Sequence, residues 1–117
     1  MKPYAPRRQS PRWLDADCPA EVLAIYDNPN FADRYTVFYS QLHEYPDTHD
    51  TALRGFIFYR AMSENPFHPC GVGISGEMRA HQVAAYRYEN RNRACRWSDL
   101  PDKVRECVLQ DVADFAA

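Results

Sequence analysis

The chain has 117 residues and a mass of 13.6 kDa, which is the size of one domain. Its 45% hydrophobic and 14% aromatic content is typical of globular proteins, and no stretch approaches the roughly 20 apolar residues of a membrane-spanning helix. These values exclude a disordered chain and an integral membrane protein. Residues 1–8 lack the apolar core of a secretory signal, so we expect a cytoplasmic protein.

The net charge of −2 conceals an uneven distribution along the chain. Residues 1–13 carry four basic residues and no acid, whereas residues 14–50 hold eight acids against Arg34 alone. Residues 51–97 hold seven arginines against three glutamates, and residues 98–117 are acidic again. Such blocks bear on the choice of partner more than on the fold. Folding either separates them into charged surfaces or interleaves them into a mixed one.

Two segments of the chain offer little apolar surface. Residues 1–13 contain three prolines and four basic residues, and we expect them to form a flexible basic tail. Residues 42–51 are polar and rich in turn formers, which predicts an exposed loop between two strands. Residues 14–117 are expected to form a single α+β domain.

Residues 18–26 fit two patterns. Asp17 as an N-cap favours a short helix, whereas the alternation along 21–26 favours a strand. The turn formers of 27–33 follow, and then a β-branched and aromatic run at 34–40 that predicts a strand. Seven residues can link two antiparallel strands, so a hairpin is the preferred interpretation and a helix the alternative.

A third strand is predicted over 55–62, where large side chains alternate. Phe56 and Phe58 fall on one face and Ile57 and Tyr59 on the other. Because both faces are apolar, we expect a central strand.

The next segment, 63–77, is expected to be a loop of defined shape. Two prolines restrict its backbone, and three of the four glycines of the chain follow within six residues. Such a loop is either a binding element or a structural connection. The polar residues selected as candidate binding residues here are Asn65, His68, Cys70 and Glu77.

The C-terminal part predicts a short helix around 78–86, a short strand at 94–97 and a closing helix over 101–115. Ser98 and Asp99 offer a cap for the closing helix. Its apolar stripe holds Val104, Cys107, Val108, Val112 and Phe115, and its predicted polar face holds Lys103, Arg105, Glu106, Gln110, Asp111 and Asp114.

These elements predict an α+β fold, in which a small, mainly antiparallel sheet packs against a C-terminal amphipathic helix. The predicted strands are 21–26, 34–40, 55–62 and 94–97. The predicted core consists of Tyr35, Val37, Phe56, Phe58, Val104, Val108 and Val112.

Several short runs resemble those of a known family. They are Tyr-Asp-Asn at 26–28, Asp-Arg-Tyr-Thr-Val at 33–37, Ser-Glu-Asn-Pro-Phe-His-Pro at 63–69 and Ser-Asp-Leu-Pro at 98–101. In this order, over residues 22–112, the chain is similar to small uncharacterised proteins carried by phages, plasmids and other bacterial mobile elements. The resemblance implies a strand ending at 26–28 and another at 33–37, and it supplies no catalytic mechanism. Cys70 stands where the family has glutamine, and the basic tail is extra.

The four cysteines, at 18, 70, 95 and 107, form no CxxC pair, so the strong zinc pattern is missing. Cys95 and Cys107 are expected in the core as reduced thiols. His68, Cys70 and His81 would be the ligands of a metal site, but no motif anchors one, and we expect neither a metal nor a cofactor.

A thiol enzyme would use Cys70 as nucleophile and His68 or His81 as base. On an extended loop, side chains two residues apart point to opposite sides, which places His68 badly for Cys70. The glycines of 71–76 have dinucleotide-loop spacing, yet they neither follow a strand directly nor sit in a βαβ unit. We therefore favour a non-enzymatic protein.

Two binding functions remain. The preferred one is a small protein of a mobile element that binds a host or defence protein, using the 63–77 loop. The alternative is nucleic-acid binding by the arginine- and tyrosine-rich segment 79–97, where basic and aromatic side chains are interleaved. Its candidate residues are Arg79, Tyr86, Arg87, Tyr88, Arg91, Arg93 and Arg96.

Overall fold

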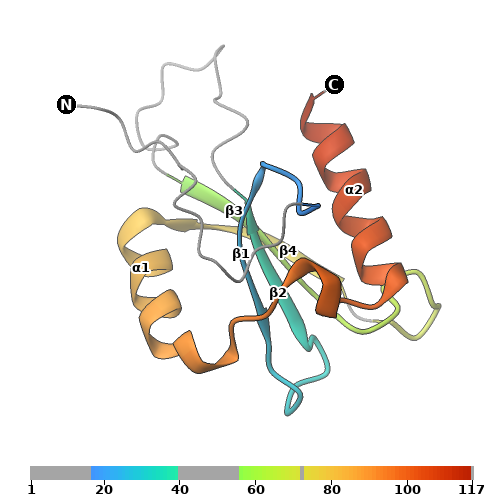
Figure 1. The fold of residues 1–117 in the computed structure, drawn as a ribbon, viewed down its shortest axis with the longest axis horizontal. Coiled ribbons are helices and arrows are strands. Elements are labelled where there is room, and N and C mark those ends of the chain that lie inside the picture. Colours follow the sequence, from blue (N-terminus) through green and yellow to red (C-terminus); the bar gives the residue numbers. More distant parts are fainter. Residues whose placement is uncertain (1–16, 40–55, 72, 117) are drawn as a thin grey trace.

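The computed structural model describes residues 17–39, 56–71 and 73–116. Over these ranges the chain forms a four-stranded antiparallel sheet in the order β1-β2-β3-β4, with helices on both of its faces (Figure 1). The strands are β1 (Val22–Asp27), β2 (Tyr35–Tyr39), β3 (Phe56–Met62) and β4 (Gly73–Arg79), and the helices are α1 (Ala80–Glu89) and α2 (Asp102–Ala116). The predicted α+β fold is confirmed.

The β1–β2 hairpin settles the ambiguity at residues 18–26 in favour of the strand. Ile25 pairs with Val37 and Asp27 with Tyr35, and the register shifts between Val22 and Ala24. A bulge of this kind changes the direction of the strand, here at the start of β1. β2 and β3 are the two inner strands, which fits the apolar character of both faces of β3.

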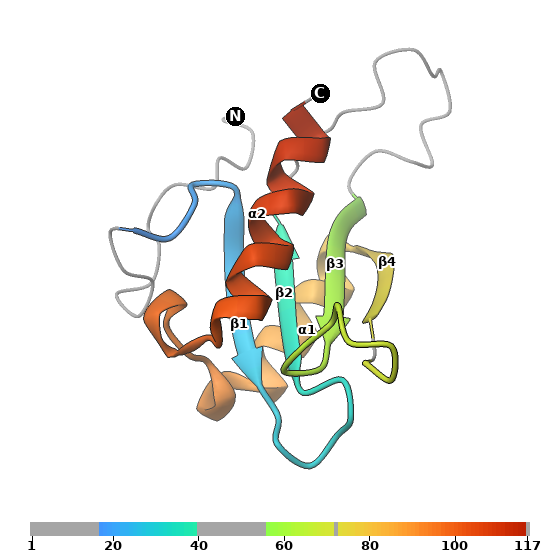
Figure 2. The same cartoon turned by 90° about the vertical axis from the view of Figure 1, so that its right-hand side faces the viewer.

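One face of the sheet packs against α2, which crosses it as a long helix (Figure 2). Tyr35, Val37, Val104 and Val108 are buried there, as predicted. Phe58 and Val112 are partly buried against the same cluster. The side chain of Phe56 lies outside the described part. Of the two cysteines expected in the core, Cys107 is buried and Cys95 is partly buried against this cluster.

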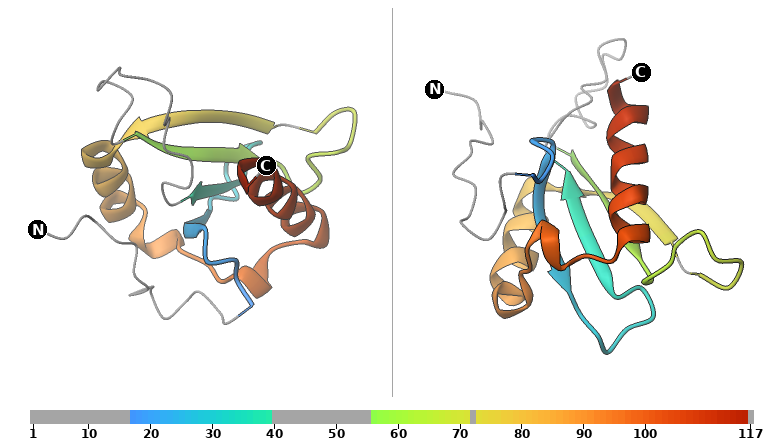
Figure 3. Two further views of the ribbon diagram at one scale, coloured as in Figure 1. Left: turned by 90° about the horizontal axis from the view of Figure 1, so that it is seen from above. Right: turned by 45° about the vertical axis from the view of Figure 1, so that its right-hand side comes forward.

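The opposite face packs against α1, so the sheet lies between the two helices (Figure 3). Ala24, Tyr26, Phe38, Ile57 and Val83 form this second cluster, and all of them are buried. The sequence predicted a cover on one face only. The short helix expected at 78–86 provides the second cover, at Ala80–Glu89.

The fourth strand is not where the sequence placed it. Residues 94–97 form no strand; Ala94 makes a single bridge to Tyr26 between two short 3₁₀ turns, η2 (Arg91–Arg93) and η3 (Trp97–Asp99). The fourth strand is β4, within and just beyond the predicted 63–77 loop. β4 is the outer strand beside β3, with which it pairs from Gly73 to Arg79, and most of its side chains are exposed.

The start of α2 and its polar face also differ from the prediction. Asp99 does not cap α2: its Oδ2 accepts the Arg96 backbone N–H at 2.9 Å within η3. Asp111 was assigned to the solvent side, but it is only 7% exposed. Its carboxylate accepts two hydrogen bonds from Arg60 and one from the Tyr39 hydroxyl, each at 2.7 Å. α2 is therefore held to the sheet by a polar network as well as by apolar packing.

Two of the predicted segments lie outside the described residues, namely the basic tail 1–13 and the loop 42–51. Among the helices of the described ranges, none has the length and apolar content needed to cross a membrane.

Candidate functional site

Two connections meet at one end of the sheet: the β1–β2 turn, residues 28–34, and the β3–β4 loop, residues 63–71 (Figure 2). Between them lies an open hollow of about 430 Å³, called here the two-loop hollow. It is lined by Pro29, Phe31, Ala32 and Arg34 from the turn and by Ser63, Glu64, Asn65, His68, Cys70 and Gly71 from the loop.

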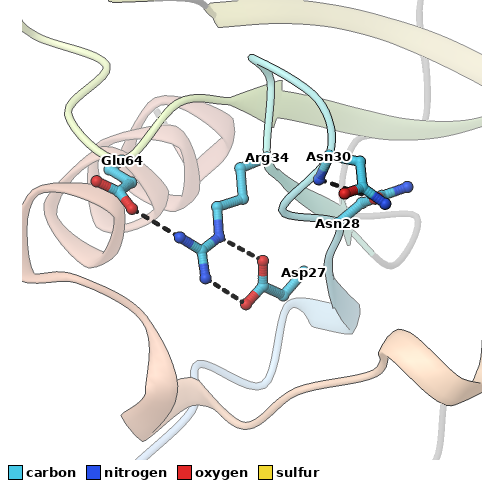
Figure 4. A network of polar contacts seen from close by, with 5 residues as sticks. All are labelled: Asp27, Asn28, Asn30, Arg34 and Glu64. Atoms are coloured by element: carbon cyan, nitrogen blue, oxygen red, sulfur yellow. Dashed lines mark hydrogen bonds and ion pairs between the residues drawn. The ribbon is translucent and has the colours of Figure 1, made fainter.

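Arg34 braces the two connections against each other (Figure 4). Its Nε and Nη2 donate to the two carboxylate oxygens of Asp27 at 2.6 and 3.0 Å, and its Nη1 donates to Glu64 Oε1 at 2.7 Å. The hydrogen bonds to Asp27 raise the pKa of the Arg34 guanidinium above its ordinary value. A planar guanidinium engaged on two sides fixes its neighbours in direction as well as in distance.

The turn 28–34 is shaped by Asn28 rather than by the aspartates at its ends. Within the described residues, neither Asp27 nor Asp33 accepts a backbone N–H bond of this turn. Instead, Asn28 Oδ1 accepts the N–H of Asn30 at 3.3 Å, and Asp27 pairs with Arg34. Asp27 therefore serves the brace between the loops.

Two of the predicted binding residues shape the β3–β4 loop from within. Asn65 Oδ1 accepts the Phe67 N–H at 3.2 Å, and His68 Nδ1 accepts the Cys70 N–H at 3.0 Å. His68 N–H donates to the Asn65 carbonyl and Gly71 N–H to the His68 carbonyl, so the segment folds as two successive turns. The backbone of 68–71 is therefore a turn and not the extended segment expected. His68 is exposed, and its Nδ1 is engaged as an acceptor.

Gly71 lets the second turn close onto the first. A Cβ atom at this position would collide with the Asn65 carbonyl oxygen and lie 3.0 Å from that of His68. Both obstacles are backbone atoms, which cannot move aside as the end of a side chain can. Any larger residue would open the loop, and the two-loop hollow depends on this glycine.

Exposed apolar side chains lie on both connections. Phe31 on the turn is 61% exposed and Phe67 on the loop is 45% exposed. Of these, Phe31 lines the two-loop hollow, and exposed aromatic residues are enriched at contact surfaces.

The structure brings together three of the four candidate loop residues. Asn65, His68 and Cys70 line the two-loop hollow. Glu77 does not line it; it pairs with Phe58 in the middle of β4. Sequence reasoning missed Phe31, Arg34 and Glu64. The sequence did contain a signal for Arg34, because it is the single arginine or lysine among the eight acids of residues 14–50.

The arginine- and tyrosine-rich segment is distributed over β4, α1 and the 3₁₀ turns. Two of its aromatic rings are engaged in packing: Trp97 is buried, and Tyr86 makes edge contacts with the rings of Tyr26 and Phe38 at 5.3 and 5.0 Å. Tyr88 is 67% exposed, and the Arg91 guanidinium lies over its ring at 4.2 Å. Arg79 ends β4, Arg87 lies on α1, Arg93 ends η2 and Arg96 precedes η3.

The residues that a metal or thiol site would need do not gather into one site. His81 lies on α1, apart from the loop that carries His68 and Cys70. Among the described residues, no group of three or more His, Cys, Asp or Glu side chains is placed to hold a metal ion. The arrangement at the two-loop hollow supplies hydrogen-bond donors and acceptors, one braced guanidinium and aromatic faces, which are the components of a recognition surface.

In comparisons with known proteins, no family model, no curated protein and no solved structure matches this chain.

Proposed function

We propose that the chain is a small, non-enzymatic cytoplasmic binding protein of a bacterial mobile element. It acts by binding a host or defence protein at the two-loop hollow. The motifs at 26–28, 33–37, 63–69 and 98–101 suggest the biological setting. The hollow provides the binding surface.

The Arg34 brace carries this proposal. Asp27, Arg34 and Glu64 link the turn to the loop before any partner arrives, and the hydrogen bonds of Asn65 and His68 fix the loop itself. A surface ordered in advance loses less conformational entropy on binding, which raises affinity. Phe31 and Phe67 then supply the exposed aromatic area that a protein partner can bury.

A tryptophan placed in the hollow tests this surface. Ala32 is exposed and lines the two-loop hollow, so Ala32→Trp fills the hollow and leaves the core untouched. Ala113 is exposed on α2 and serves as the matched control, Ala113→Trp. Tagged proteins are used to capture partners from bacterial lysate, with and without nuclease. We expect a protein that survives nuclease treatment, is retained by Ala113→Trp and is lost with Ala32→Trp. Equal capture by both variants would contradict the proposal.

Nucleic-acid binding is the second candidate, because five arginines and one acid occupy residues 79–96 and the Tyr88 ring is exposed with Arg91 stacked on it. This surface lies on α1 and η2, and none of its residues lines the two-loop hollow. Recovery of nucleic acid in the same experiment, with proteins lost after nuclease, supports this function. The triple variant Arg87→Ala, Arg91→Ala, Arg93→Ala should then lose the nucleic acid, and Ala32→Trp should keep it.

A further inference from the structure

A second hollow, of about 290 Å³, lies on the α1 face of the sheet. It shares Phe31 with the two-loop hollow and has otherwise different lining residues. Three aromatic rings line it, those of Phe31, Tyr59 and Tyr86, together with Met78 and Ala61. This space is called here the aromatic hollow.

The residues that line the aromatic hollow include one acid and no cation. Asp33 is the only charged residue among its lining residues. In the part of the chain that the structure describes, no hydrogen bond or ion pair engages the Asp33 carboxylate. The neighbouring cation, Arg34, is already shared by Asp27 and Glu64. An occupant of the hollow therefore meets an acid that still lacks a counter-charge.

The aromatic walls are held in place by their own packing. The ring of Tyr59 lies against Gly76, where a Cβ atom would come within 2.9 Å of the tyrosine hydroxyl oxygen. Tyr86 is fixed by edge contacts with Tyr26 and Phe38. Gly76 in this outer strand thus leaves room for the Tyr59 ring, and the ring forms one side of the hollow.

Hydrogen-bond acceptors accompany the rings. Asn90 lines the hollow and donates its Nδ2 to the Tyr86 carbonyl oxygen at 2.9 Å, which leaves its Oδ1 as an acceptor. The Asp33 carboxylate supplies two further acceptor oxygens. The hollow thus combines aromatic faces, hydrogen-bond acceptors and one unneutralised carboxylate. This combination suits a flat cation that donates hydrogen bonds from its edge.

We infer that the aromatic hollow binds the guanidinium group of an arginine side chain presented by a partner protein. A guanidinium is planar and weakly hydrated, stacks on aromatic rings and pairs with a carboxylate through two parallel hydrogen bonds. A neutral apolar side chain would leave Asp33 unmatched, and Asp33 repels a phosphate. The inference is independent of the two-loop hollow, because it concerns different lining residues and a defined ligand.

The probe for this site is the peptide acetyl-Gly-Arg-Gly-amide, titrated into the full chain at about 0.15 M salt to screen non-specific attraction. Binding is followed by two-dimensional ¹H–¹⁵N NMR. We expect saturable shifts at the backbone amides of Asp33, Tyr59 and Asn90. The peptide with citrulline in place of arginine has the same shape and no charge, and should bind about tenfold more weakly. Equal binding of the two peptides, or shifts confined to the acidic exposed face of α2, would overturn the inference.

Two variants separate the site from general electrostatics. Asp33→Asn keeps the size of the side chain and should weaken binding of the arginine peptide about tenfold, whereas Asp114→Asn removes an equal charge on α2 and should leave it unchanged. Tyr59→Leu keeps an apolar wall without the ring and should also weaken binding. The NMR spectrum of each site variant shows whether it is folded. If one of them is unfolded, the peptide affinity of the other provides the test. If a folded site variant binds the arginine peptide as the wild type does, the proposed arginine site is rejected. The proposed function at the two-loop hollow would still stand, because Ala32→Trp tests it separately.

Discussion

Among the side chains that the structure describes, α2 buries Val104, Cys107, Val108 and Asp111 against one face of the sheet, whereas α1 buries Val83 against the other. The α2 face is closed by a long helix and an internal polar network. The α1 face is covered by a shorter helix, and the aromatic hollow lies on the same face. The α2 face thus has a structural role, whereas the α1 face leaves side chains available for contact.

The strongest test of this contrast is the buried network on the α2 face. Asp111→Ala removes the carboxylate that accepts two hydrogen bonds from Arg60 and one from the Tyr39 hydroxyl beneath the helix. We expect the free energy of unfolding to fall by about 3 kcal/mol, as measured by urea denaturation. Asp114→Ala, on the exposed side of the same helix, should change it by less than about 0.5 kcal/mol. Similar effects of the two substitutions would show that the network does not hold α2.

Alkaline pH should weaken the same face through Cys95. Burial, with the nearby carboxylates of Asp27 and Asp99, raises the pKa of Cys95 to about 12 from its ordinary 9.0. The unfolded chain therefore loses this proton first, so the stabilising effect is complete below pH 9 and is lost as the pH rises toward 12. The expected loss by pH 10.5 is at most about 2 kcal/mol, and solvent reduces it because the thiol is only partly buried.

Comparison with Cys95→Ala isolates this contribution. Burial also raises the pKa of Tyr39 and of Cys107, and both residues destabilise the wild type and the variant alike at high pH. Under reducing conditions, the free energy of unfolding of Cys95→Ala should fall less between pH 8 and pH 10.5 than that of the wild type. Parallel pH profiles would mean that the Cys95 thiol is not shielded from water.

The α1 face should respond more weakly. Val83→Ala should lower the free energy of unfolding by about 1.5 kcal/mol, less than the roughly 2.5 kcal/mol expected for Val108→Ala on the α2 face. Hydrogen exchange gives an independent measure, because the amides of α1 should exchange faster than those of α2. Equal protection of the two helices would remove the distinction between the faces.

The sequence predicted the elements whose side chains repeat with a clear period. The alternation of β3 and the apolar stripe of α2 were sufficient for the α+β fold. β4 was missed because its glycines suggested a loop, and an outer strand paired on one side needs no alternating apolar pattern. Asp111 was misplaced by residue type, although its spacing of three from Val108 and seven from Val104 puts it on the buried stripe.

The candidate site was predictable only in part. The prolines and glycines of 63–71 marked a shaped loop, and Asn65, His68 and Cys70 do line a hollow. Its other wall is the β1–β2 turn, and nothing local in the sequence indicates which turn meets which loop. That contact depends on the antiparallel order of the strands and on Arg34, which joins residues 30 positions apart.

The smallest change to the chain with a functional consequence is expected at Gly76. A Cβ atom there would press against the Tyr59 ring, whose free end can turn aside, while the reduced freedom of the unfolded chain partly offsets the strain. Gly76→Ala should therefore alter the free energy of unfolding by less than about 1 kcal/mol. The displaced ring should nevertheless weaken binding of the arginine peptide severalfold, although residue 76 does not line the aromatic hollow. Retained affinity in the folded variant would show that the position of the Tyr59 ring does not matter for recognition.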